Sequence, residues 1–364
     1  MFLDRPAERP EELFDRTEEA RRLAEAISSR AATLVVGMRR IGKTSLIKAT
    51  TYNLRRIYVD ARAFEDRRYI TYADLLDALA GELKRLLPLH KRLGDLLRSV
   101  RGVSVAGLSL EFERGRKAPR LAELLEALDR WGEESGDKVV LVLDEAQELA
   151  KLKGADVLPA LAYAYDNLRH LAVIYSGSKA GLLARFLRLD DPESPLYGRY
   201  MERIEVAPFS RELSLAYLEA GFAEAGVRIS RELIEKAVDA LDGVVGWLAY
   251  FGLRALSDPD AALEEALAYA ERLAGLEFCH FVEAMGSPRY LHVARLAAAG
   301  ARWSDVKRYL TAVEGRALTD AEVTKLLRNL VDYGFLEKRG DLYVVPDPVL
   351  RRALQSLRCG RSSL

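Results

Sequence analysis

The chain has 364 residues, of which 49% are hydrophobic and 30% charged, a composition typical of a soluble globular protein with two or three domains. Its 55 basic and 55 acidic side chains balance, so no whole-chain field favours a nucleic acid or a membrane surface as partner. The start lacks the apolar core of a signal peptide and no apolar run has bilayer length, so we expect a cytoplasmic protein without a membrane partner.

The chain opens with a predicted amphipathic helix over residues 14–27, for which Asp15 or Thr17 is the candidate cap. An apolar, β-branched run at 32–36 follows and predicts a buried strand. A helix start at 45–49 comes shortly afterwards. The segment between the run and the helix start therefore connects a strand to a helix.

That connecting segment, residues 37–44, reads Gly-Met-Arg-Arg-Ile-Gly-Lys-Thr and matches the phosphate-binding P-loop, G-x-x-x-x-G-K-[ST]. Its strand-to-helix context favours a P-loop over a glycine turn before a surface helix. Lys43 would reach the β- and γ-phosphates of ATP, and the Thr44 hydroxyl would bind Mg²⁺. The candidate residues for binding ATP or ADP here are Gly37, Met38, Arg39, Arg40, Ile41, Gly42, Lys43, Thr44 and Ser45.

The next segments continue an alternation of helices and strands. The predicted elements are a strand at 54–60, helical periodicity over 69–100 that Pro88 interrupts, a small hairpin at 102–112 and a helix over 121–131. This alternation is typical of an α/β fold with a parallel sheet.

Residues 139–145 read Val-Val-Leu-Val-Leu-Asp-Glu, an apolar strand that ends in two carboxylates. Such a strand is buried on both faces in the middle of a parallel sheet, and its carboxyl end lies where ligands bind. This Walker B pattern predicts that Asp144 holds Mg²⁺ and that Glu145 is the general base that polarises the attacking water. A strand that ends in a solvated acidic loop is the alternative.

A helix at 158–167 and a further buried strand at 171–178 are predicted next. This strand ends in hydroxyl side chains. Ser176 or Ser178 is therefore a candidate for sensing the γ-phosphate or for positioning the attacking water. Serines that only form a turn or cap a helix are the alternative. A loop at 195–203 then leads to the last predicted strand, 204–206.

After this strand, helical signals replace strand signals. Ser210 and Ser230 are candidate N-caps of two helices, a turn at 242–248 leads into a third helix, and a fourth is predicted over 261–273. Two further short helices are predicted at 290–299 and 304–310.

The last part of the chain predicts a winged helix. Thr319 and Glu322 have the spacing of a capping box that opens a helix over 319–333, and a hairpin is predicted over 335–345. The cysteines, Cys279 and Cys359, show neither a disulfide framework nor a zinc spacing.

The sequence resembles the archaeal ATPase family within the STAND branch of AAA+ proteins, over nearly its whole length. The motifs that carry the resemblance are residues 14–16, 37–46, 143–147, 176–178, 195–199 and 347–351. The resemblance implies an α/β P-loop NTPase with an AAA+ core over 1–206, a helical lid over 207–286 and a winged-helix domain over 287–364. It also implies that ATP binds between core and lid.

The resemblance implies further site residues. Phe14 and Arg16 would lie near the adenine and ribose. Arg199 has the position of an arginine that in AAA+ proteins often contacts the γ-phosphate, either within the chain or across a subunit interface. The alternative for Arg199 is a structural ion pair. Arg203 is a weaker candidate for the same role. Members of the family have a Gly-x-Pro motif in the lid, and this sequence has Val245 at the position of the proline. This difference argues against the usual contact between lid and nucleotide. Arg254 is a candidate for contacting phosphate instead.

The favoured function is an ATP-driven switch in which ATP binding reorients the winged helix and slow hydrolysis resets it. The alternative is a DNA-binding ATPase in DNA loading, repair or transcription regulation. Residues 301–364 contain 12 basic and 8 acidic side chains, and the 319–333 helix is expected to expose Lys325 and Arg328, together with Thr324 and Asn329. A winged helix also docks proteins or supports self-assembly. A metabolic P-loop kinase is disfavoured, because an Asp-Glu pair suits water activation.

Overall fold

The computed structural model describes residues 1–29 and 32–360, which fold as two compact units. The α/β unit contains Ala7–Gly37 and Lys43–Val206. The helical unit contains Met1–Pro6, the short segment Met38–Gly42 and the chain from Ala207 onward. The P-loop sequence therefore contributes its first and last residues to one unit and its middle residues to the other.

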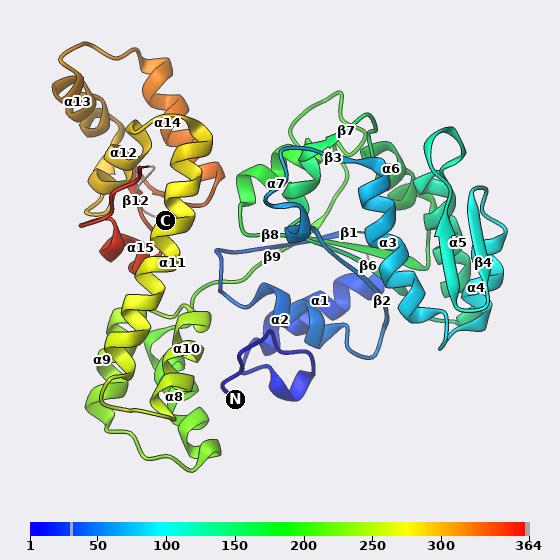
Figure 1. The fold of residues 1–364 in the computed structure, drawn as a ribbon, viewed down its shortest axis with the longest axis horizontal. Coiled ribbons are helices and arrows are strands. Elements are labelled where there is room, and N and C mark those ends of the chain that lie inside the picture. Colours follow the sequence, from blue (N-terminus) through cyan, green and yellow to red (C-terminus); the bar gives the residue numbers. More distant parts are fainter. Residues whose placement is uncertain (30–31, 361–364) are drawn as a thin grey trace. The chain divides into compact units, whose positions relative to one another are not determined.

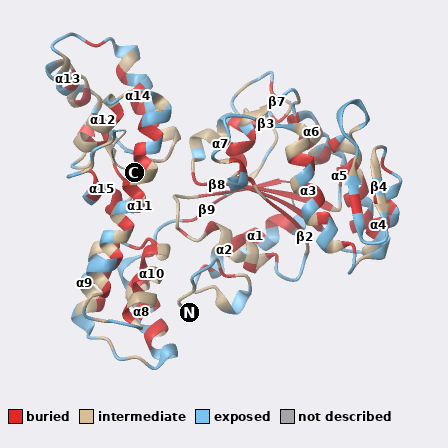
Figure 2. Cartoon of the chain, in the orientation of Figure 1, coloured by how far each residue is buried: buried red, intermediate tan, exposed pale blue. Residues whose placement is uncertain are grey.

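A five-stranded parallel sheet is the centre of the α/β unit, with the strand order β2-β6-β8-β1-β9. Its strands are β1 (Ala32–Val36), β2 (Arg55–Asp60), β6 (Val139–Asp144), β8 (Leu171–Gly177) and β9 (Glu202–Glu205). Every residue of β1, β6 and β8 is buried, as Figure 2 shows, which explains their continuous apolar sequences. The predicted α/β fold with a parallel sheet is confirmed.

Helices cover both faces of this sheet (Figure 1). The α-helices among the unit's described residues are α1 (Thr17–Ser29), α2 (Lys43–Thr50), α3 (Tyr72–Leu86), α4 (Lys91–Arg98), α5 (Leu121–Ser135), α6 (Leu158–Asn167) and α7 (Ala180–Leu187), of which α4 packs against α5. α1 and α2 lie on one face, and α3, α5 and α6 lie on the other. Parallel strands need such crossover helices. Two small sheets complete the unit: the hairpin of β4 (Val103–Ala106) and β5 (Ser109–Phe112), and the pair of β3 (Ile70–Thr71) and β7 (Leu152–Lys153).

The helical unit begins with a bundle and ends with a winged helix. The bundle contains α8 (Arg211–Ala225), α9 (Arg231–Leu241), α10 (Val245–Ala255) and α11 (Ala262–Met285). Ser210 and Ser230 cap α8 and α9, as the sequence predicted. The rest contains α12 (Arg289–Ala297), β10 (Ala301–Arg302), α13 (Trp303–Glu314), α14 (Asp320–Asp332), β11 (Glu337–Arg339), β12 (Leu342–Val344) and α15 (Pro348–Ala353). The predicted capping box of Thr319 and Glu322 opens α14.

Helix α11 belongs to both parts of this unit. Near its start, Tyr269 stacks on Tyr250 of α10 with ring centroids 4.4 Å apart. Near its end, Phe278 and Phe281 pack against Phe335, at 5.0 and 4.9 Å. Figure 1 shows α11 as one long helix with α10 beside one end and α12 and α15 beside the other. A single rigid element therefore connects the bundle to the winged helix.

The structure corrects several element predictions. α11 extends to Met285 rather than residue 273, because its second half is buried against the aromatic cluster. Neither α7 nor α15 was predicted, and α1 starts at Thr17 because Asp15 has a positive φ of 52°.

The prediction of unlinked cysteines is also wrong. Cys279 on α11 forms a disulfide with Cys359, 80 residues later. The number and spacing of two cysteines do not indicate a pairing across 80 residues of sequence. Within residues 1–29 and 32–360, no helix combines the length and the apolar character of a membrane span.

Candidate nucleotide site

The carboxyl edge of the parallel sheet gathers three predicted catalytic residues of the α/β unit, Lys43, Glu145 and Ser178. Gly37 follows β1, Asp144 ends β6 and Ser178 follows β8, and these three strands are neighbours. The Lys43 Nζ donates to the Gly37 carbonyl at 2.9 Å. Strand order thus brings together residues that are far apart in the sequence, as expected at the topological switch point of an open sheet.

Asp144 is fully buried at this edge and accepts hydrogen bonds from three hydroxyl groups. Thr44 Oγ1 donates to it at 2.9 Å and Tyr58 OH at 2.5 Å, and Ser176 Oγ also donates. A hydroxyl beside a carboxylate is a set of hard oxygen ligands of the kind that Mg²⁺ prefers. Thr44 and Asp144 therefore fit a bound magnesium ion, although metal binding by them stays a prediction.

Glu145 is held in a strained conformation beside Asp144. Its φ of 50° lies in the left-handed region, which non-glycine residues adopt at a cost that functional sites often tolerate. Its carboxylate accepts from the Ser178 N–H at 3.0 Å, from the Ser178 hydroxyl at 2.7 Å and from Gln147 Nε2 at 2.6 Å. Ser178 thus contacts the proposed base, whereas Ser176 contacts Asp144.

The charge of Lys43 sets the protonation of Glu145. Burial acts to raise the pKa of Glu145, but Lys43 Nζ lies 3.8 Å from the carboxylate. Together with the hydrogen bonds from Ser178 and Gln147, this charge lowers the pKa to about 2. Glu145 is therefore ionised at neutral pH and, in this arrangement, is a weak proton acceptor.

The N-terminal residues predicted to lie near the base and sugar belong to the same unit. Arg16 is buried and donates to Glu19 at 2.9 Å. Phe14 lies half-buried just before α1. Ser45 accepts from the Ala7 N–H at 3.1 Å and so links α2 to this N-terminal segment. A role of Phe14 or Arg16 in binding the adenosine remains a prediction.

The middle of the P-loop sequence packs within the helical unit. The Arg40 guanidinium donates to both carboxylate oxygens of Glu277 on α11, at 3.2 Å for one pair, and lies 4.3 Å from the ring centroid of Trp247. The Arg39 Nη1 lies 3.4 Å from Glu277. The Arg40 carbonyl accepts from the Gly246 N–H at 2.9 Å. Two P-loop residues therefore share one carboxylate of α11.

The segment around Val245, which lacks the proline of the family's lid motif, contacts the middle of the P-loop sequence. A Cβ on Gly246 would lie 2.8 Å from the Arg40 Cβ, so only glycine permits this approach. Val245 is also close, since a Cβ on Gly42 would lie 3.4 Å from its methyl group. The proposal for Arg254 is not supported, because its guanidinium pairs with Glu265.

Arg199 lies at the opposite edge of the sheet from Lys43. It precedes β9, whose first residue, Glu202, pairs with Thr33 near the start of β1, while the P-loop follows the end of β1. Its guanidinium binds Asp166 at the end of α6, with Nε–Oδ1 at 2.9 Å. Arg199 is therefore not part of the phosphate site of its own chain, and only an action on a second copy remains as a catalytic prediction. Arg203 pairs with Glu205 at 3.8 Å.

The two basic side chains that were predicted to be exposed on the winged helix do face solvent. Lys325 and Arg328 are exposed on α14. Asn329 was expected on the same face, but it donates to Tyr290 OH at 2.7 Å inside the fold. Thr324 is exposed and accepts from Trp303 Nε1 at 3.2 Å.

Sequence reasoning missed three contributors to these clusters. The contribution of Tyr58 could be predicted only from the strand order, because that order places β2 beside β6. Gln147 belongs to the motif at residues 143–147, but the sequence assigned it no role. Glu277 could not be found, because 237 residues separate it from Arg40.

A P-loop and an Asp-Glu pair at the carboxyl edge of a parallel sheet define a P-loop ATPase. The chain belongs to the family of ATPase domains found predominantly in Archaea, which matches residues 13–251. Residues 285–345 match the C-terminal winged helix-turn-helix domain of MCM proteins. The predicted family is therefore confirmed.

The chain is also similar to several solved structures, of which the first supports this assignment. The Walker-type ATPase paby2304 of Pyrococcus abyssi is 34% identical over 97% of this chain and 99% of that chain, with a TM-score of 0.84. The Orc1 protein of Aeropyrum pernix in complex with DNA is 18% identical over 94% and 91%, with a TM-score of 0.44. The RuvB Holliday junction branch migration motor of Thermotoga maritima is 11% identical over 93% and 94%, with a TM-score of 0.43. A search of curated proteins gave no match.

Proposed function

We propose that the protein is an ATP-driven molecular switch that couples the nucleotide bound at its P-loop to the arrangement of its winged helix. The observation that carries this proposal is the contact of Arg39 and Arg40 with Glu277. These arginines belong to the loop that meets phosphates, and Glu277 belongs to the helix that connects the bundle to the winged helix. A change of the loop on nucleotide binding therefore acts directly on α11.

The chemistry of the proposed switch follows from the residues at the sheet edge. Lys43 holds the β- and γ-phosphates, and Thr44 and Asp144 hold Mg²⁺, which when bound neutralises charge on the phosphates. Glu145 orients a water molecule and accepts its proton. Ser178 and Gln147 fix the direction of the Glu145 carboxylate through their hydrogen bonds.

The proposed turnover is slow. Glu145 with a pKa of about 2 accepts a proton poorly at neutral pH. When Lys43 turns from Glu145 toward phosphate oxygens, the carboxylate loses its nearest cation and its pKa rises. Hydrolysis thus depends on a rearrangement that nucleotide binding drives, which suits a switch better than a metabolic enzyme.

Replacing Glu277 with glutamine is expected to uncouple the two parts. The variant keeps ATP turnover within a few-fold of wild type but loses the ATP-dependent change in hydrogen exchange of α15, because the charge that links Arg40 to α11 is gone. Hydrogen-exchange mass spectrometry with ATP and with ADP measures this change. Glu283→Gln, at an exposed glutamate of the same helix, is the matched control. An unchanged ATP response in Glu277→Gln would refute the coupling.

A second candidate function is DNA binding through the winged helix. Two acidic side chains of α14 that oppose it are engaged by cations: Asp320 pairs with Lys307 at 2.7 Å, and Glu322 with Arg316 at 2.8 Å. Lys325 and Arg328 stay exposed on the same helix. This charge pattern supports contact with phosphates of a duplex.

The double substitution of Lys325 and Arg328 with alanine tests this candidate. If the winged helix binds DNA, affinity for a duplex falls and the slope of log affinity against log salt becomes shallower by up to about two, because two phosphate contacts are lost. Fluorescence anisotropy over a salt series measures both, with Lys236→Ala as control at an exposed lysine of α9. No duplex binding by wild type at low salt would favour a protein partner instead.

A further inference from the structure

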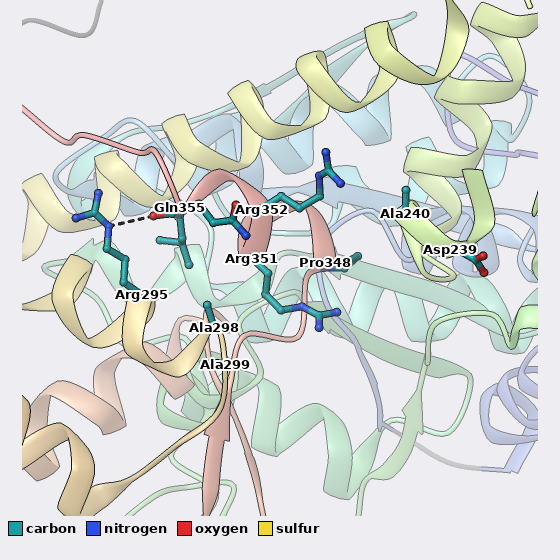
Figure 3. A pocket seen from close by; sticks show the side chains of 10 residues that line it. Asp239, Ala240, Arg295, Ala298, Ala299, Pro348, Arg351, Arg352 and Gln355 are labelled. Atoms are coloured by element: carbon teal, nitrogen blue, oxygen red, sulfur yellow. Dashed lines mark hydrogen bonds between the residues drawn. The ribbon is translucent and has the colours of Figure 1, made fainter. Parts of the chain in front are cut away.

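The helical unit contains a pocket that no part of the nucleotide site uses. Its volume is about 590 Å³, within the range of small-molecule sites. Figure 3 shows its lining from three segments: α9 with Asp239, α12 and its end with Arg295 and Ala299, and the region of α15 with Arg351 and Arg352. Three arginines and one aspartate thus surround one cavity.

Arg295 brings a positive charge to the pocket and forms no ion pair with the carboxylates of the described residues. Its Nε donates to the Leu354 carbonyl at 3.0 Å, and its Nη2 donates to the Leu357 carbonyl. Carbonyl groups hold the guanidinium in place but carry no net charge. Across the described part of the chain, no ion pair within 4.0 Å involves Arg295.

Arg351 has donors that the fold leaves unused. Its Nη2 lies 3.4 Å from the carboxylate of Asp242, which is largely exposed. An exposed ion pair of this kind contributes little to stability. The Arg351 Nε is buried, and within the described residues it has no hydrogen-bond partner. A buried donor without an acceptor is unfavourable, so a ligand oxygen at this guanidinium would be stabilised.

The acidic groups around the pocket do not cancel these charges. Asp239 accepts from Arg211 at 3.0 Å, and Arg211 does not line the cavity. Glu271 accepts from Arg352 at 2.7 Å and leaves Arg295 and Arg351 unaffected. In Figure 3, Arg351 lies between the α12 residues and Asp239. The centre of the pocket is therefore positive.

The motif at residues 347–351, to which the sequence assigned no role, contributes two residues to the lining of this pocket. Asp347 accepts from the Val349 N–H at 2.9 Å and so fixes the first turn of α15. Pro348 and Arg351 both line the cavity. The motif thus orients the arginine whose buried Nε has no hydrogen-bond partner among the described residues.

We propose that this pocket binds a phosphate group, with Arg295 and Arg351 as its main ligands. Planar guanidinium groups match phosphate oxygens with paired, charge-assisted hydrogen bonds. The group belongs either to a small phosphate ester, for which the volume is sufficient, or to the phosphodiester backbone of a nucleic acid. Both sources present the same oxygens to the arginines.

Calorimetric titration of the full chain, saturated with ADP so that the P-loop is occupied, tests the proposal. Inorganic pyrophosphate and a short DNA duplex are the two probes. In Arg351→Gln, the affinity for the probe that binds is expected to fall about tenfold or more, because charge-assisted bonds are lost. Arg308→Gln, at an exposed arginine of α13, is the matched control and should bind as wild type does.

A second variant keeps the test valid if Arg351→Gln folds poorly. Ala299 is exposed and lines the pocket, so Ala299→Glu adds a carboxylate there without removing a contact of the fold. It should also abolish binding. Pyrophosphate binding that both variants lose identifies a small ester, and duplex binding alone that both lose identifies a nucleic acid backbone. Binding of neither probe, or binding that both variants retain, overturns the proposal.

Discussion

Replacing Glu145 with glutamine is expected to lower ATP turnover by about two to four orders of magnitude, because the proposed general base is removed. The new side chain keeps the shape of glutamate, and Ser178 can still donate to its oxygen. ATP should bind at least as tightly as in wild type, since Lys43 loses the carboxylate that lies 3.8 Å from it. Phosphate release measures turnover, and equilibrium titration measures affinity.

The control for this variant is Glu113→Gln, at an exposed glutamate of the α/β unit. This control should change neither ATP turnover nor ATP affinity. Turnover in Glu145→Gln close to the wild-type rate would remove Glu145 as the base. A parallel loss of ATP affinity would show instead that Glu145 contributes to binding rather than to proton transfer.

Replacing Lys43 with alanine is expected to weaken ATP binding by about tenfold to a hundredfold, because charge-assisted contacts to two phosphates are lost. Lys43 is 5% exposed and is fixed by the Gly37 carbonyl, so its ammonium group is already positioned for the phosphates. Equilibrium titration with ATP measures the effect, and Lys84→Ala, at an exposed lysine of α3, is the control. Wild-type affinity in Lys43→Ala would contradict the assignment of the P-loop.

The same variant has a pH signature in its stability. The pKa of Glu145 is lowered from 4.5 to about 2 in the folded protein, so its ionised form contributes stability above pH 4.5 that is lost as the pH falls toward 2. Lys43→Ala removes the nearest cation and raises this pKa. The variant should therefore unfold more easily than wild type at neutral pH, and the difference should shrink below pH 4.5. Chemical denaturation of the nucleotide-free proteins over a pH series measures it.

Local patterns predicted the sheet edge of the site well. The P-loop and the strand ending in Asp144 and Glu145 are continuous in sequence, and their apolar character follows from burial on both faces. Tyr58 is different, because its contact with Asp144 depends on which strands are neighbours, and that is a property of the whole sheet.

The helical unit was predicted less well, for a related reason. The predicted helix ended at residue 273, although the buried residues of the second half of α11 recur on one face at helical spacing. Neither the pair of Arg40 with Glu277 nor the disulfide of Cys279 with Cys359 was predicted, because 237 and 80 residues separate their members. Both contacts join segments that only tertiary packing brings together.

The central claim is that the nucleotide at the P-loop changes the winged helix through α11. The most direct test is the hydrogen exchange of α11 and α15 in the wild-type protein, measured with ATP and then with ADP. The account predicts that exchange at both helices differs between the two nucleotides. A difference confined to residues 32–60 and 139–178, with α11 and α15 unchanged, would contradict it.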